Sequence, residues 1–159
     1  MHSNTDEARR YRIFLVDDEQ DITYSLKKGL ENEGFEVEAF TSPVIALRNY
    51  KPGTYDLALL DIRMPEMSGF ELFRKIKEKD GKIRVCFITA FEIYYDEFRR
   101  VFPKLKVKCF VRKPVSISVL ARVIKEEIEW REEMIKAEAP IEQTKGRTSL
   151  DKQAVVKIK

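Results

Sequence analysis

Short apolar runs alternate along the chain with longer stretches whose apolar residues recur at helical spacing. The runs predict strands at Arg12–Val16, Glu36–Phe40, Leu57–Leu60, Val85–Thr89 and Cys109–Val111. Most of them are continuously apolar, which indicates strands buried on both faces. Glu36–Phe40 alternates between polar and apolar residues, which indicates a more exposed strand.

The intervening stretches predict helices, and their ends carry recognisable signals. The predicted helices are Asp21–Glu33, Pro43–Tyr50, Ser68–Lys79, Tyr94–Val101 and a last helix from Ile117 towards Glu138. Ser42 followed by Pro43 is a typical helix start. Gly34 and Pro140 lie where the first and last helices are expected to end.

Strand followed by helix, repeated five times, predicts an α/β fold. We expect a (βα)5 doubly wound parallel sheet of five strands, with helices on both faces and an extended C-terminal helix. Ligands bind such sheets at the carboxyl ends of the strands. The candidate chemistry therefore lies just after Val16, Leu60, Thr89 and Val111.

Composition indicates one domain with a core. The chain has 159 residues, of which 43% are hydrophobic and 36% are charged. No apolar run is long enough for a transmembrane helix, and the polar N-terminus lacks the apolar segment of a signal peptide. We therefore expect a cytoplasmic protein without membrane contacts.

The two cysteines, Cys86 and Cys109, each lie in an apolar run. We expect two reduced, buried thiols, with a disulfide or a redox switch as the less favoured alternative. The net charge is +3, but residues 98–114 hold seven basic residues and no acid. A solvated face is the favoured interpretation of this segment, ahead of binding to nucleic acid or to an acidic partner.

Four of the five predicted strands end next to polar side chains that suit phosphoryl chemistry. They are Asp17 and Asp18, Asp61, Thr89 and Lys113. Carboxylates gathered in one crevice repel one another, and a divalent cation relieves that repulsion. Since all the ligands are oxygens, Mg²⁺ is the expected ion. One carboxylate can then act as the nucleophile, while the Lys113 ammonium and the Thr89 hydroxyl contact phosphoryl oxygens.

Four segments at these strand ends resemble the signatures of response-regulator receiver domains, the CheY-like phosphoacceptor modules of two-component signalling. They are Leu15–Glu19 (LVDDE), Asp61–Gly69 (DIRMPEMSG), Thr89-Ala90 and Lys113-Pro114. The resemblance covers residues 11–130 and implies a flavodoxin-like strand order, 2-1-3-4-5. Residues 1–10 are then an N-terminal tail, 131–139 an extension of the last helix, and 140–159 a disordered basic tail.

The resemblance implies a role for each matching residue. Asp61 would accept the phosphoryl group, and Thr89 and Lys113 would hold its oxygens. The implied magnesium ligands are Asp17, Asp18, Asp61 and the backbone carbonyl of Arg63. Phe110 takes the position of the switch aromatic, expected to turn inward as Thr89 moves towards the phosphoryl group.

Two further positions would modulate the acyl phosphate. Arg63 and Phe91 lie two residues after Asp61 and Thr89, so both would flank the phosphoryl group. Arg63 adds positive charge, and the bulky ring of Phe91 would exclude attacking water. Our hypothesis is a long-lived acyl phosphate.

The expected protein is a signalling phosphoacceptor that acts on no external substrate. Its donor is a sensor histidine kinase or a phosphotransfer protein, and it controls an unknown protein downstream. The surface of the fourth helix, fifth strand and fifth helix would change on phosphorylation, and it or the extended last helix could form a homodimer. Only 21 residues follow Glu138, so we expect a stand-alone receiver.

Other functional classes fit less well. An aspartyl phosphatase would carry D-x-D on the first strand, and a dinucleotide-binding enzyme would carry G-x-G-x-x-G after it. The sequence has Asp17-Asp18-Glu19-Gln20 there and no glycine between Arg12 and Lys28. The remaining alternative is a receiver-like scaffold or nucleic-acid-associated regulator that works without phosphorylation.

Overall fold

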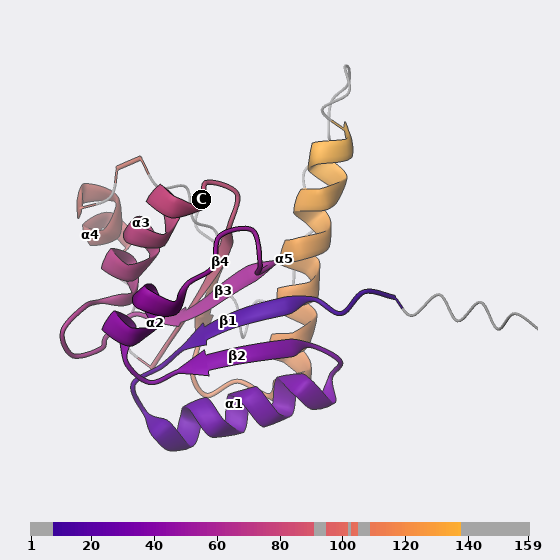
Figure 1. Ribbon diagram of the computed structural model, residues 1–159, viewed down its shortest axis with the longest axis horizontal. Coiled ribbons are helices and arrows are strands. Elements are labelled where there is room, and N and C mark those ends of the chain that lie inside the picture. Colours follow the sequence, from indigo (N-terminus) through magenta and orange to yellow (C-terminus); the bar gives the residue numbers. More distant parts are fainter. Residues whose placement is uncertain (1–7, 91–94, 102, 105–108, 138–159) are drawn as a thin grey trace, which may run out of the picture.

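The computed structural model describes residues 8–90, 95–101, 103–104 and 109–137 as a parallel sheet flanked by helices (Figure 1). The strands are β1 (Arg12–Val16), β2 (Glu36–Phe40), β3 (Leu57–Asp61), β4 (Arg84–Thr89) and β5 (Phe110–Arg112). The helices are α1 (Gln20–Asn32), α2 (Pro43–Asn49), α3 (Gly69–Lys79), α4 (Tyr95–Val101) and α5 (Ile117–Ala137). All strand pairs are parallel in the order β2-β1-β3-β4-β5, so the predicted fold and strand order are confirmed.

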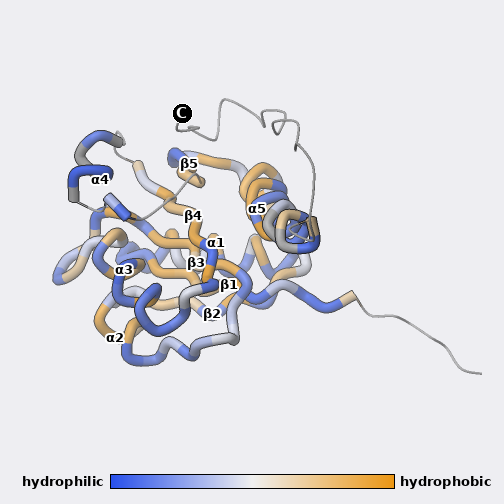
Figure 2. Tube along the Cα trace, turned by 90° about the horizontal axis from the view of Figure 1, so that it is seen from above, coloured by the Kyte–Doolittle hydropathy of each residue, from blue (hydrophilic) through white to orange (hydrophobic). Residues whose placement is uncertain are grey.

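Two hydrophobic cores lie on opposite faces of the sheet, because successive side chains of a strand point to opposite sides. Ile13 and Leu15 of β1 pack with residues of α1 and α5. Phe14 and Val16 pack with residues of α2, α3 and α4. Figure 2 shows hydrophobic strands in the middle of the molecule, surrounded by helices in which hydrophilic and hydrophobic residues alternate. Both faces of β1 and β3 are therefore dry, which explains their continuously apolar sequences.

Helix ends follow the expected capping chemistry. The Ser42 hydroxyl accepts a hydrogen bond from the Ile45 amide, with Pro43 at the first helical position of α2. The Ser68 hydroxyl accepts one from the Glu71 amide at the start of α3. Gly34, beyond the end of α1, has a φ of 97°, a conformation that favours glycine.

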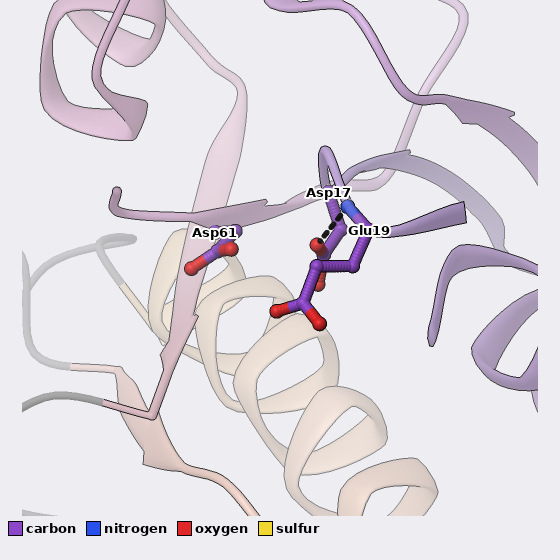
Figure 3. A group of neighbouring side chains, drawn as sticks. All are labelled: Asp17, Glu19 and Asp61. Atoms are coloured by element: carbon purple, nitrogen blue, oxygen red, sulfur yellow. Dashed lines mark hydrogen bonds between the residues drawn. The ribbon is translucent and has the colours of Figure 1, made fainter. Parts of the chain in front are cut away.

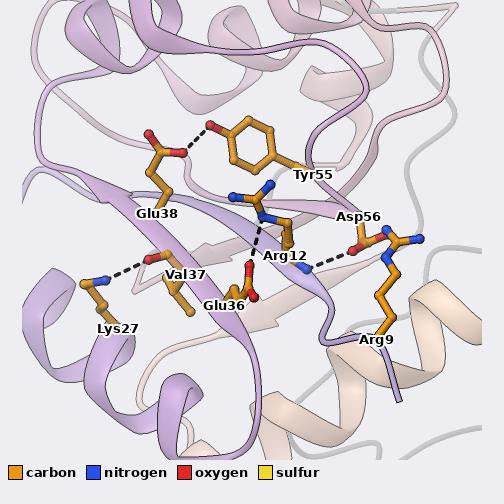
Figure 4. Close-up of polar contacts among 8 residues, drawn as sticks. All are labelled: Arg9, Arg12, Lys27, Glu36, Val37, Glu38, Tyr55 and Asp56. Atoms are coloured by element: carbon orange, nitrogen blue, oxygen red, sulfur yellow. Dashed lines mark hydrogen bonds and ion pairs between the residues drawn. The ribbon is translucent and has the colours of Figure 1, made fainter. Parts of the chain in front are cut away.

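Polar contacts tie together the amino ends of the three strands β2, β1 and β3 (Figure 4). Asp56 accepts hydrogen bonds from the Arg9 guanidinium at 2.6 Å and from the Arg12 amide at 2.8 Å. The Arg12 side chain pairs with Glu36 at 3.0 Å. The polar residues at the opposite, carboxyl ends of β1 and β3 take no part in these contacts.

The two cysteines are joined by a disulfide, so the expectation of two reduced thiols is wrong. Both are buried, as expected, but Phe87 of β4 lies opposite Phe110 of β5, which puts Cys86 opposite Cys109. The two Cα atoms are 4.7 Å apart, a spacing that a disulfide spans without backbone movement. The pairing depends on the register of two strands, which local sequence does not reveal.

Helix α5 extends well past the edge of the sheet (Figure 1). Its first turn packs closely on α1, because a Cβ on Gly29 would lie 2.6 Å from the Ile117 side chain. It continues to Ala137, and the predicted tail 140–159 lies outside the described residues. Within the part of the chain that is described, none of the helices has the length and apolar character needed to cross a bilayer.

Candidate functional site

The carboxyl ends of β1, β3, β4 and β5 bring four of the predicted residues together. Asp17 follows β1 and Lys113 follows β5, while Asp61 and Thr89 end β3 and β4. Asp17 is 0%, Thr89 1% and Asp61 5% exposed. Such buried polar groups need partners, because leaving them unpaired costs several kcal/mol.

Lys113 is the cationic partner of the two buried carboxylates. Its Nζ lies 2.6 Å from Asp17 Oδ2 and 3.7 Å from Asp61 Oδ2, and its side chain is 11% exposed. The Lys113 amide donates to the Thr89 carbonyl at 2.8 Å, and the peptide bond to Pro114 is cis. The Lys113 ammonium therefore connects the ends of two strands through a contact between residues 96 positions apart.

A third carboxylate joins the site from the turn between β1 and α1. Single carboxylate oxygens of Asp17, Glu19 and Asp61 lie within 4.8 Å of one another (Figure 3). The Glu19 amide donates to Asp17 Oδ1 at 3.0 Å, which folds the turn back towards the site. Sequence reasoning missed Glu19, although its position directly after Asp17-Asp18 was the available signal. Asp18 is half-buried and lies outside this group of oxygens.

Burial, together with the negative charges of Asp17 and Asp18, raises the pKa of Asp61 to about 6, against the opposing effect of the Lys113 charge. Burial alone would lower the pKa of Lys113. The hydrogen bond to Asp17 and the charge of Asp61 outweigh that effect, so the pKa of Lys113 is raised and the ammonium stays charged. The site thus combines a destabilised carboxylate with a fixed cation.

The donor set suits a hard divalent cation. Asp17, Glu19 and Asp61 offer only oxygen ligands, and three carboxylates beside one ammonium leave an excess of negative charge. A cation would favour the charged form of Asp61, which burial destabilises. The residues present therefore fit a Mg²⁺ ion.

The loop after Asp61 is shaped by close backbone packing. Gly69 donates its amide to the Ile62 carbonyl at 2.8 Å, and a Cβ at this position would overlap the Asp61 carbonyl oxygen. Glu66 adopts a φ of 71°, which is rare for a residue with a side chain. Met64 and Met67 pack against the core, whereas the Arg63 side chain is exposed. The loop therefore leaves the side chain of Arg63 exposed, two residues after Asp61.

Phe110 is fully buried among aromatic rings. Its ring centroid lies 5.4 Å from that of Phe87 and 5.9 Å from that of Phe98. The aromatic at the predicted switch position is therefore turned into the core in this structure. Phe91, the other predicted modulator, lies outside the described residues.

Comparisons with known proteins agree with this arrangement. Residues 13–125 match the family of the response regulator receiver domain. The transcriptional regulatory protein CssR of Bacillus subtilis is 40% identical over 80 residues, which is 50% of this chain and 35% of CssR. The response regulator receiver protein CpdR of Brucella abortus is 39% identical over 80 residues, or 50% of this chain and 67% of CpdR.

Solved structures show the same fold. The CheY-like receiver domain protein from Methanospirillum hungatei superimposes with a TM-score of 0.71 at 29% identity, covering 79% of this chain and 99% of that one. The family match spans the five strands, apart from Arg12 at the start of β1, and the residues gathered at their carboxyl ends. The chain therefore belongs to the receiver domains of response regulators, the modules that kinases phosphorylate in two-component signalling.

Proposed function

We propose that Asp61 is the phosphoacceptor of this receiver domain. The observation that carries the assignment is the contact of Lys113 Nζ with both buried carboxylates, Asp17 and Asp61. Asp61 is the one of the two that also lies at the end of the central strand β3, before the tightly packed Gly69 loop. A nucleophilic carboxylate at this place has a cation beside it and little competing water.

The proposed transfer breaks the P–N bond of a phosphohistidine and forms a P–O bond to one Asp61 oxygen. The leaving imidazole takes up a proton from solvent. With a pKa of about 6, Asp61 is mostly ionised at neutral pH and can donate its lone pair. Lys113 then balances charge on a phosphoryl oxygen, and the Thr89 hydroxyl donates to another.

Mg²⁺ is the proposed cofactor, held by the carboxylates of Asp17, Asp18 and Asp61 and by the Arg63 carbonyl. Glu19 is added to this set because its carboxylate lies in the same cluster as those of Asp17 and Asp61. When bound, the ion would neutralise charge on the phosphoryl oxygens and on the carboxylates. Asp17 would keep its hydrogen bond to Lys113 and so orient the ammonium towards Asp61.

The donor is proposed to be a sensor histidine kinase or a phosphotransfer protein, and the output a change in the surface of α4, β5 and α5. Thr89 would move towards the phosphoryl group, and Phe110 would alternate between its buried position and one turned towards that surface. The downstream partner is a protein, and a homodimer through the same surface or through α5 is a further proposal. Arg63 and Phe91 remain the proposed modulators of acyl phosphate lifetime.

Intact-protein mass after incubation with a small acyl phosphate and Mg²⁺ tests the assignment. We expect the wild type to gain one phosphoryl group and Asp61→Asn to gain none. Asp21→Asn, an exposed carboxylate of α1, is the matched control and should react like the wild type. An adduct that persists in Asp61→Asn would refute the assignment, and an adduct on none of the proteins would favour a scaffold that works without phosphorylation.

A further inference from the structure

Thr23 of α1 has a buried hydroxyl next to the turn that carries Asp17 and Glu19. The residue is 6% exposed, and its Oγ1 lies 2.6 Å from the Asp17 carbonyl oxygen and 2.9 Å from the Glu19 carbonyl oxygen. A hydroxyl has one proton, so the two carbonyls share it, and the shorter distance favours Asp17. The Thr23 side chain therefore binds the backbone of the turn that carries the site's acidic residues.

Helical geometry accounts for only one of these two contacts. A threonine hydroxyl often bonds to the carbonyl four residues before it, as Thr23 does to Glu19. Asp17 precedes Glu19, the N-cap residue of α1, and lies six residues before Thr23. The bond to Asp17 is thus a tertiary contact that ties the end of β1 to the body of α1.

The orientation of Asp17 matters because each of its carboxylate oxygens has a separate partner. Oδ2 accepts from Lys113 at 2.6 Å, and Oδ1 accepts from the Glu19 amide at 3.0 Å. The Asp17 amide is held by the Phe40 carbonyl at 3.1 Å, and its own carbonyl is held by Thr23. Because hydrogen bonds hold both the amide and the carbonyl of Asp17, its carboxylate is directed at Lys113. The same turn places the Glu19 carboxylate in the cluster.

From this geometry we infer that Thr23 is a positioning residue for the cation site. The inference rests on the proposed function, because it assumes that the carboxylates of Asp17, Glu19 and Asp61 share an ion. Thr23 binds no ion itself. It favours ion binding by holding the Asp17–Glu19 turn in the geometry that the ion requires. Losing such a supporting contact typically weakens metal affinity about 10-fold or more.

Three variants separate this role from general stabilisation. Thr23→Val keeps the shape and removes the hydroxyl, and Thr23→Ser keeps the hydroxyl and removes a methyl group. Thr54→Val is the matched control, because Thr54 lies before the amino end of β3, far from the site. Each protein is titrated with Mn²⁺ followed by electron paramagnetic resonance, with Mg²⁺ as competitor, and its thermal unfolding is recorded with and without the ion.

We expect Thr23→Val to bind Mn²⁺ about 10-fold more weakly, and to gain correspondingly less thermal stability from it. Thr23→Ser and Thr54→Val should bind like the wild type. If Thr23→Val does not fold, Thr23→Ser against Thr23→Ala supplies the same comparison. Equal affinity in the proteins with and without the hydroxyl would overturn the inference alone, whereas a wild type that binds no Mn²⁺ would overturn the proposed cation site and the inference with it.

Discussion

Asp61 is a buried acid whose charged form the fold disfavours. Its raised pKa means that folded protein binds a proton more tightly at this site than unfolded protein does. The carboxylate therefore contributes fully to stability only below about pH 4, its ordinary pKa, and that contribution is lost as the pH rises through about 6. Without a cation or a phosphoryl group beside it, the ionised Asp61 carboxylate therefore lowers the free energy of unfolding.

The asparagine variant tests this linkage. Asp61→Asn removes the ionisation, so in the absence of divalent cations it should be about 2 kcal/mol more stable than the wild type at pH 7.5. The gain should shrink towards zero at pH 4, where the wild-type carboxyl is protonated. Urea unfolding at the two pH values measures it, and a variant no more stable than wild type at pH 7.5 would show that Asp61 is not strained by its surroundings.

Gly69 supplies a second residue-scale test. Gly69→Ala should destabilise the domain by about 2 kcal/mol or more and displace the Asp61 loop, because the added methyl group would overlap the Asp61 carbonyl oxygen. Gly81→Ala is the matched control: a Cβ there meets nothing within 4 Å, so its free energy of unfolding should change by less than about 0.5 kcal/mol. Equal behaviour of the two variants in urea would contradict the packing described for the loop.

At the scale of elements, the strand and helix ends were predictable to within one residue, leaving aside the start of α4 and the end of α5, which adjoin residues outside the described part of the chain. Parallel strands buried on both faces have continuously apolar sequences, which makes them recognisable. Gly34, Ser42 and Pro43 are residue types that are typical of helix ends. The joint placement of Asp17, Asp61, Thr89 and Lys113 followed from the same rule, because parallel strands gather their carboxyl ends.

What sequence did not reveal depends on tertiary geometry. Glu19 joins the cluster in a turn where its amide binds Asp17, and Thr23 reaches the Asp17 carbonyl through the same folded turn. The disulfide needs the register of β4 against β5, which no local pattern specifies. Of these features, the disulfide joins two strands that are distant in the sequence, whereas the contacts of Glu19 and Thr23 form at the folded turn between β1 and α1.

The disulfide gives a prediction at this scale. It joins residues 23 positions apart, so its reduction should lower the free energy of unfolding by about 3 kcal/mol, because the unfolded chain gains conformational entropy. Urea unfolding with and without a thiol reductant measures the difference. A Cys86→Ala, Cys109→Ala double variant should be insensitive to the reductant, and two thiols titrating in unreduced, unfolded wild type would contradict the cross-link.

At the scale of the whole molecule, the sheet order explains why the site can exist. Placing β1 and β3 side by side brings Asp17 to Asp61, and β4 and β5 then deliver Thr89 and Lys113 from the other side. The amino ends of β1, β2 and β3 are joined to one another by ion pairs and hydrogen bonds (Figure 4). The amino ends of these strands are thus cross-linked by polar contacts, whereas the carboxyl ends carry the residues of the candidate site.

The most direct test of the central claim is to locate the phosphoryl group on the chain. After phosphorylation by a small acyl phosphate with Mg²⁺, borohydride reduces an aspartyl phosphate to homoserine, which peptide mass spectrometry can place. We predict homoserine at position 61 in the wild type and nowhere in Asp61→Asn. Homoserine at position 17 or 18, or an adduct on another type of side chain, would contradict the account.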